Sequence, residues 1–225
     1  MPSVGRNSLP HKECYIEGTW YPSVTTVIAS KPKPYIDAWQ KKWGSLADRK
    51  MKLSGAIGTE FHACIERWMN DKSYYKVDEP MLDDGRRIPS TVGRIRGMFH
   101  AFMDWANGTD GELHQTELHL VSRRFGYSGT LDAVGTFKGE PMLYDYKSSS
   151  AIYPDMALQL AAYAQVYEEE YGVHIAKGMI VNVPKKRPFK VKTKVFDLTV
   201  DKFLEFNDLL TEFRKGPSDA KALID

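Results

Sequence analysis

Cysteine is scarce in this sequence, and its spacing excludes two classes of protein. Of 225 residues only Cys14 and Cys64 are cysteines, and they lie far apart with no CxxC pair. A small secreted domain held by disulfides and a thiolate zinc site both need more cysteines at closer spacing. We expect two free structural thiols in a reducing compartment.

Long apolar runs and a strong net charge are also missing. No stretch of 18 consecutive apolar residues occurs, and the first residues, "MPSVGRNSLPHKECYIEG", lack the apolar segment of a signal peptide. These absences predict a cytoplasmic protein without a membrane partner, either of a cell or of a phage within its host. Because 31 Lys and Arg face 29 Asp and Glu, inferences about partners must rest on where the charges lie.

The sequence does contain the material for one hydrophobic core. Its hydrophobic fraction is 42%, and it shows no internal repeat or low-complexity block. We therefore predict a single domain over residues 1–225. Within it we expect a mainly helical part (1–110), a core sheet (111–198) and a C-terminal helix (199–215).

The N-terminal part has helical periodicity after a short extended start at residues 15–21. We expect helices over residues 22–71, with breaks at Pro32, at Pro34 and around Gly55 and Gly58. An amphipathic helix is predicted over residues 91–106, where apolar residues recur every three or four positions.

Further along, the period of the apolar residues shortens to two. Strands are predicted at residues 118–121, 127–137 and 142–146, which would form a meander. A helix over 153–171, strands in "HIAKGMIVNVP" and "FKVKTKVFDL", and a last amphipathic helix follow. This order predicts an α/β or α+β fold, with one mixed sheet flanked by helices.

Two of the predicted strands carry charged residues inside apolar runs. Alternation places Asp145 and Lys147 on one face, and an antiparallel turn at "TFKGEP" would bring Asp132 close to them. Adjacent carboxylates repel each other, and either a proton or a bound divalent cation reduces this repulsion. Oxygen ligands of this kind suit Mg²⁺ or Mn²⁺. Two carboxylates that hold such a cation beside a lysine are typical of a phosphodiester hydrolase, and we predict this activity. Taken alone, DxK also fits an exposed ion pair on a solvated strand.

The wider pattern resembles a known family. The segments "GTEFHACIE", "YSGTLDAVG", "LYDYKSS" and "QLAAY" occur in the order found in the PD-(D/E)XK nucleases. Within them, the chain resembles the RecB-like exonuclease branch, which includes the Cas4 proteins and the mitochondrial genome maintenance exonuclease. The upstream "YPSVTTVI" and "YIDAWQKKWG" extend the similarity to residues 21–183. The resemblance implies a restriction-endonuclease-like αβββαβ core with a helical N-terminal extension.

The resemblance also implies roles for individual residues. Asp132 and Asp145 would bind the metal, with His62 and the backbone carbonyl of Tyr146 as further ligands, and Lys147 would be the catalytic lysine. A histidine ligand would shift the preference from Mg²⁺ toward Mn²⁺. Taken alone, His62 would better fit an ordinary hydrogen-bonded histidine on an amphipathic helix, and the aspartates downstream favour the ligand role.

Four more polar residues have two interpretations each. Gln159 and Tyr163, one helical turn apart, would support the lysine and contact the substrate backbone, or Tyr163 would simply pack in the core. Glu66 would orient His62, or pair with a nearby cation on the surface. Glu117 resembles a recurrent acid of the family, or is a plain edge-strand charge.

Two departures from the family pattern are visible. Leu131 stands where the family name has proline, and the second acid is aspartate, but neither change alters the ligand chemistry. An iron–sulfur cluster held by four cysteines, as in Cas4-like proteins, is excluded by the cysteine count.

Basic segments flank the candidate site in sequence. "KPKPYIDAWQKKWGSLADRKMK" precedes it and "PKKRPFKVKTK" follows it, with Trp39, Trp43 and Phe189 available to stack on unpaired bases. Equally, these segments fit solvated surface.

We predict a metal-dependent DNA exonuclease that acts on ends or single strands without sequence preference. Its expected protein partner is a replication or recombination protein. The alternatives are a structure-selective endonuclease of the same fold, a non-catalytic DNA-binding module, and an assembly protein with an incidental acidic cluster.

Overall fold

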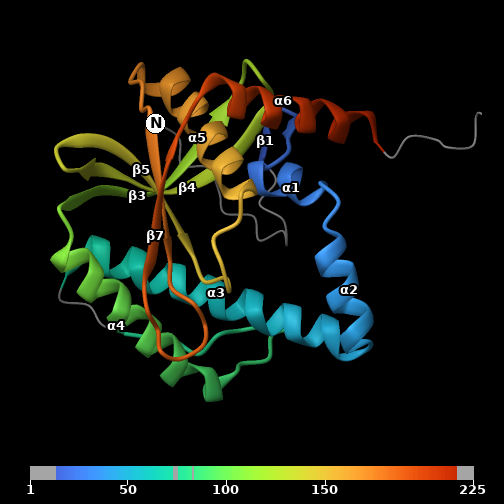
Figure 1. Ribbon diagram of the computed structural model, residues 1–225. Helices are drawn as coiled ribbons and strands as arrows, with labels where there is room; N and C mark the ends of the chain where they lie inside the picture. The colour runs from blue at the N-terminus through green and yellow to red at the C-terminus, as the bar shows by residue number, and fades with distance from the viewer. Residues whose placement is uncertain (1–13, 73–75, 83, 217–225) are drawn as a thin grey trace, which may run out of the picture.

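The N-terminal part of the molecule is a hairpin followed by helices. The computed structural model describes residues 14–72, 76–82 and 84–216 (Figure 1). The first elements are β1 (Cys14–Ile16), β2 (Thr19–Tyr21), α1 (Val24–Ala29), α2 (Pro34–Trp43), α3 (Leu46–Asn70), a 3-10 turn η1 (Pro89–Thr91) and α4 (Val92–Gly108). Among the helices in these ranges, none combines the length and apolar character needed to cross a bilayer.

The rest of the chain forms the central sheet and its remaining helices. The elements are β3 (Gly111–Ser122), β4 (Tyr127–Phe137), β5 (Glu140–Lys147), α5 (Asp155–Tyr171), β6 (Lys177–Asn182), β7 (Lys192–Asp197) and α6 (Val200–Lys215). The strand order is β3-β4-β5-β6-β7, and only the β5–β6 pair is parallel. α5 makes the crossover that a parallel pair requires. The predicted mixed sheet with flanking helices and N-terminal helices is confirmed.

Helices cover both faces of the sheet (Figure 1). On one face, residues of α1, α5 and α6 pack with Leu143 of β5 in one buried cluster. On the other face, residues of α3 and α4 pack with Tyr144 and Tyr146 in a second cluster. Because neighbouring residues of β5 join opposite clusters, Asp145 and Lys147 lie on the same face as Leu143, the face covered by α5.

The predicted helix break at Gly55 and Gly58 is wrong. α3 runs without interruption from residue 46 to residue 70. A glycine inside a helix costs about 1 kcal/mol relative to alanine, and here the buried Ile57 and Phe61 anchor the same stretch. The absence of a side chain at Gly58 lets Ser148, just beyond the end of β5, lie close to α3. A Cβ atom at position 58 would be 3.3 Å from Ser148 Oγ.

Prolines delimit the shorter helices as expected. Pro34 stands at the start of α2, where its fixed φ favours a helix and its missing N–H is not needed. Pro32 lies in the link between α1 and α2. The first sheet strand is longer than predicted, because residues 111–117 are mostly polar and owe their strand structure to backbone pairing with β4.

Candidate active site

β5 delivers an acid and an amine to the face covered by α5. Asp145 is 1% exposed, and its Oδ1 accepts a hydrogen bond of 2.8 Å from Nε2 of Gln159 on α5. Lys147 Nζ lies 2.6 Å from Asp145 Oδ2 as an ion pair and donates to Gln159 Oε1 at 3.0 Å. These contacts confirm that Asp145 and Lys147 share a face. They also fix the position of the lysine ammonium from two sides.

Tyr163 supports this group from the next turn of α5. Its hydroxyl accepts a hydrogen bond of 3.4 Å from Gln159 Nε2, as the spacing of one helical turn allows. Its ring lies against Gly129 of β4, where a Cβ atom would come within 2.6 Å of the ring. Only glycine fits at that position unless the ring moves. We refer to Asp145, Lys147, Gln159 and Tyr163 as the lysine group.

Beyond Ala133 the strands β4 and β5 separate, and Asp132 fills the gap. The ladder between them ends at the pair Ala133 and Tyr144. Oδ2 of Asp132 then accepts a hydrogen bond of 2.7 Å from the Tyr146 backbone N–H, in place of a ladder carbonyl. The Asp132 carboxylate reaches His62 on the α3 side, while Asp145 contacts Gln159 of α5. The two carboxylates remain near each other, since Asp132 raises the pKa of Asp145.

On that side a histidine and two acids gather. His62 of α3, Glu117 of β3 and Asp132 each offer a ligand atom, and the three atoms lie within 4.8 Å of one another. His62 Nδ1 is 3.2 Å from Asp132 Oδ1. Glu117 is directed here by a backbone irregularity: its φ is +51°, and neither it nor Asp132 appears in the β3–β4 pairing register. We refer to these three residues as the acidic group.

The donor set of the acidic group fits a divalent cation. One imidazole nitrogen and two carboxylates suit Mg²⁺ or Mn²⁺, and oxygen donors predominate in sites for both. The residues are therefore suitable for a metal site, and the geometry does not select the ion.

The two aspartates have opposite electrostatics. Burial raises the pKa of the Asp132 carboxyl, but His62, Lys147 and the Tyr146 N–H together bring it below its usual range. Burial raises the pKa of Asp145 to about 6, with Lys147 opposing the rise and Asp132 adding to it. Burial lowers the pKa of His62, yet Asp132 reverses this and leaves the pKa above that of an ordinary histidine. Asp132 is thus the carboxylate that stays ionised.

The structure places the residues chosen from the sequence in these two groups. His62 and Asp132 join the acidic group, where Glu117, the reserve candidate, completes the set. Asp145 and the Tyr146 carbonyl are not members of that set, and their role as ligands stays a prediction. The signal for Glu117 was its resemblance to a recurrent acid of the family, but its positive φ cannot be read from the sequence.

Glu66 belongs to neither group. It makes no hydrogen bond or ion pair with any residue in the ranges that the structure describes. The nearby Arg67 instead forms an ion pair with Glu60, which also accepts a hydrogen bond of 2.8 Å from the Asp78 backbone. An orienting role of Glu66 toward His62 therefore has no support in the geometry.

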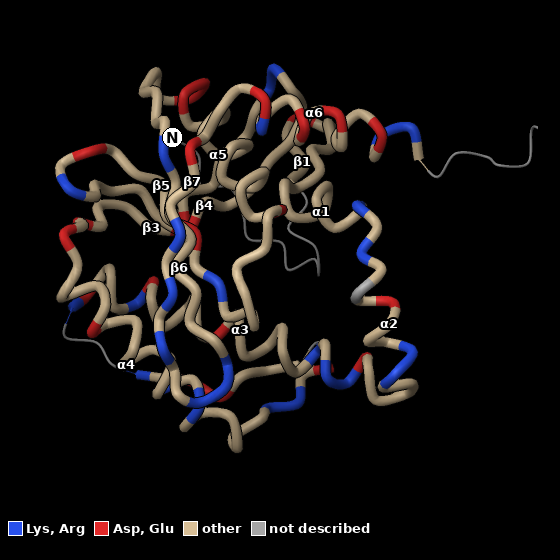
Figure 2. The backbone as a smooth tube through the Cα atoms, in the orientation of Figure 1, with Lys and Arg blue, Asp and Glu red and all other residues tan. Residues whose placement is uncertain are grey.

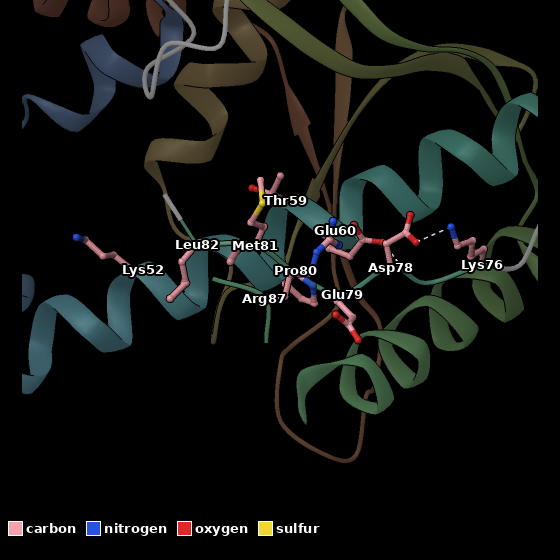
Figure 3. Close-up of a pocket in the computed structure, with 12 residues that line it drawn as sticks. Lys52, Thr59, Glu60, Lys76, Asp78, Glu79, Pro80, Met81, Leu82 and Arg87 are labelled. Atoms are coloured by element: carbon pink, nitrogen blue, oxygen red, sulfur yellow. Dashed lines mark hydrogen bonds and ion pairs between the residues drawn. The ribbon is translucent and has the colours of Figure 1, made fainter. Parts of the chain in front are cut away.

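Two pockets lie near these elements, and only one touches the site. A pocket of about 230 Å³ includes Lys147 and Gln159 in its wall, beside Ile28, Tyr153 and Met156. A larger one of about 790 Å³ lies between α3 and residues 76–87 (Figure 3). Its wall mixes cations with acids and contains none of the residues of the two groups, so we place the chemistry at the smaller pocket.

Comparison with known proteins agrees with this geometry. The model of the PD-(D/E)XK nuclease superfamily matches residues 35–224. No curated protein matches the sequence. Among solved structures, the chain is similar to SSO0001, at 14% identity and a TM-score of 0.40, covering 91% of this chain and 78% of the other. It is also similar to a candidate exonuclease from Eubacterium rectale, at 12% identity and a TM-score of 0.39, covering 69% and 61%. Likenesses this distant add no argument, but the family match spans most of the chain, which therefore belongs to the PD-(D/E)XK nuclease superfamily.

Proposed function

We propose that this protein is a metal-dependent DNA exonuclease. It would hydrolyse phosphodiester bonds at DNA ends or in single strands during replication, recombination or repair. The observation that carries the proposal is the meeting of the acidic group and the lysine group where β4 and β5 separate, bridged by the hydrogen bond from the Tyr146 N–H to Asp132. Membership of the superfamily supports phosphodiester hydrolysis on a nucleic acid.

The acidic group is the proposed holder of the metal. His62, Glu117 and Asp132 would bind it, and Asp145 and the Tyr146 carbonyl would add ligands, as the resemblance implies. Such a cation, when bound, acts as a Lewis acid on a phosphoryl oxygen and lowers the pKa of coordinated water. Asp132 is suited to this task because its lowered pKa keeps it ionised at neutral pH.

The lysine group would supply charge at the reacting phosphate. Lys147 is held by Asp145 and Gln159 and forms part of the wall of the 230 Å³ pocket. A fixed ammonium can orient a water molecule or stabilise the negative charge that develops on a phosphoryl oxygen, without reorganisation during the reaction. Gln159 and Tyr163 position the lysine, and their contacts to the substrate backbone remain a prediction.

The test is digestion of end-labelled linear single-stranded and duplex DNA beside covalently closed circles. Each reaction contains Mg²⁺, Mn²⁺ or EDTA, and compares wild type with Lys147→Ala and with Lys215→Ala, an exposed lysine at the end of α6. We expect metal-dependent loss of linear DNA alone. Lys147→Ala should slow it about 10²- to 10³-fold, and Lys215→Ala should cut like wild type.

Other outcomes would replace the proposal. Cleavage of closed circles would identify a structure-selective endonuclease, because circles have no ends. DNA binding without any cleavage, by a folded protein with metal present, would identify a non-catalytic binding module. Neither binding nor cleavage would favour an assembly role.

A further inference from the structure

A cavity with basic walls lies beside the candidate active site. It has a volume of about 480 Å³ and lies between the β6–β7 connection and the start of α4. Its lining consists of Ser90, Arg94, Lys185, Lys186, Arg187 and Phe189. Figure 2 shows that much of this connection is blue, the colour of Lys and Arg. Four of the six lining residues are cations, and none is an acid.

The charge of this cavity is uncompensated within the protein. Throughout the described ranges, Arg94, Lys185, Lys186 and Arg187 form no ion pair with any acid. The cost of this arrangement is visible at Lys185, since burial and the nearby Arg94 lower its pKa to about 8. Cations on an open surface are solvated at little cost, but a half-buried ammonium beside a guanidinium is stabilised by an anion.

Two contacts fix the cavity relative to the lysine group. Lys185 Nζ donates a hydrogen bond of 2.8 Å to the backbone carbonyl of Ser148, the residue that follows Lys147. On the other side the Phe189 ring rests against Gly97 of α4, in the space where a Cβ atom would lie 2.3 Å from the ring. The connection is thereby held between α4 and the end of β5, rather than extending freely into solvent.

We propose that this cavity binds a phosphate group of the nucleic acid strand, at a position outside the bond that is cleaved. The inference rests on the proposed function for the identity of the strand. Two guanidinium groups, two ammonium groups and the Ser90 hydroxyl all donate hydrogen bonds, and guanidinium forks match phosphate oxygens in pairs. Such an interaction would position the strand over Lys147 without reading its sequence.

The test measures binding in EDTA, so that cleavage plays no part. Fluorescence anisotropy would follow single strands with a 5′-phosphate, with a 5′-hydroxyl and in closed circles, for wild type, Arg94→Ala and Arg187→Ala. Both arginines are exposed, so the variants should fold. The matched control is Lys190→Ala, an exposed lysine of the same connection that does not line the cavity.

We expect each arginine variant to bind about tenfold more weakly, as for the loss of one charge-assisted hydrogen bond. The slope of log affinity against log salt should fall by about 0.7 for each phosphate that the variant no longer neutralises, and Lys190→Ala should match wild type. Weaker binding of all three substrates would assign an internal phosphate. Weaker binding of the phosphorylated end alone would assign a terminal one, and inorganic phosphate should then compete.

Wild-type affinity and salt dependence of both arginine variants would overturn the inference. This failure is distinguishable from failure of the proposed function. A wild-type protein that cuts nothing, but whose binding weakens in Arg94→Ala, would keep the phosphate site and lose the nuclease. A wild-type protein that cuts DNA, with arginine variants that bind normally, would keep the nuclease and exclude the phosphate site.

Discussion

The acidic group and the lysine group are neighbours where β4 and β5 separate, but they handle charge differently. The acidic group gathers two carboxylates and one imidazole whose ligand atoms lie within 4.8 Å of one another, a donor set that suits a divalent cation. The lysine group pairs its single carboxylate with an ammonium, and Gln159 forms a hydrogen bond with each of them. Metal binding and lysine positioning are therefore separable tasks, supported by α3 and α5 respectively. Variants of the two groups should fail in different ways.

The largest effect is expected when each aspartate is replaced by asparagine. Asp132→Asn should weaken metal binding at least about 100-fold and reduce cleavage about 10³-fold. Asp145→Asn should reduce cleavage similarly but weaken metal binding at least tenfold less, because Lys147 already pairs with that carboxylate. Titration calorimetry with Mn²⁺ and single-turnover cleavage separate the two readouts. Equal losses of metal affinity would make Asp145 as important a ligand as Asp132 and remove the distinction between the two groups.

A smaller effect is expected at Glu117. Glu117→Gln should weaken metal binding about 10- to 100-fold and leave the single-turnover rate at saturating metal nearly unchanged. The matched control is Glu112→Gln on the same strand, whose side chain is 81% exposed. If both variants bind metal like wild type, the acidic group lacks its third ligand.

The pH dependence of stability should distinguish the two aspartates further. The folded pKa of Asp145 is raised to about 6, so its contribution to stability is present at low pH and is lost as pH rises through about 6. Metal-free Asp145→Asn should therefore melt no lower than wild type at pH 8. Asp132, whose pKa is lowered, contributes stability that is lost as pH falls. Differential scanning fluorimetry from about pH 3 to pH 8 covers both ranges, and a lower melting temperature of Asp145→Asn at pH 8 contradicts this assignment.

The smallest effect is expected at Gln159, which positions the lysine without carrying charge. Gln159→Leu should reduce the single-turnover rate about tenfold, as for one lost hydrogen bond to a charged group, and leave Mn²⁺ affinity unchanged. Gln165→Leu, on the same helix, is the control and should react normally. A change in metal affinity with Gln159→Leu would show that the two groups are not separable.

The sequence predicted the parts of this site that depend on strand alternation and helical spacing. Asp145 with Lys147, and Gln159 with Tyr163, lie together because periods of two and of about four residues put them there. The fold class followed from the same periods. The break predicted at Gly58 was wrong because packing and the approach of Ser148 outweigh intrinsic propensity.

What the sequence did not predict depends on departures from regular structure. Asp132 does come near Asp145 and Lys147, as predicted. The sequence did not show that β4 and β5 part beyond Ala133, so that Asp132 accepts from the Tyr146 N–H and contacts His62. Glu117 is brought to the same place by a positive φ. The sequence predicted that Phe189 could stack on bases, but in the structure its ring packs against Gly97 of α4. Long-range backbone irregularities of this kind leave no periodic signal.

The hydrogen bond from the Tyr146 N–H to Asp132 bears on how this protein can evolve. Tyr146 is 2% exposed, so an unpaired N–H there would cost about 1–3 kcal/mol. A lineage that no longer needed cleavage could change position 132 to asparagine, which keeps an acceptor, at little cost to folding. A change to alanine would remove the acceptor and weaken the sheet. Genetic drift toward an inactive descendant is thus limited at position 132 to residues that keep a hydrogen-bond acceptor, because the fold also uses that acceptor.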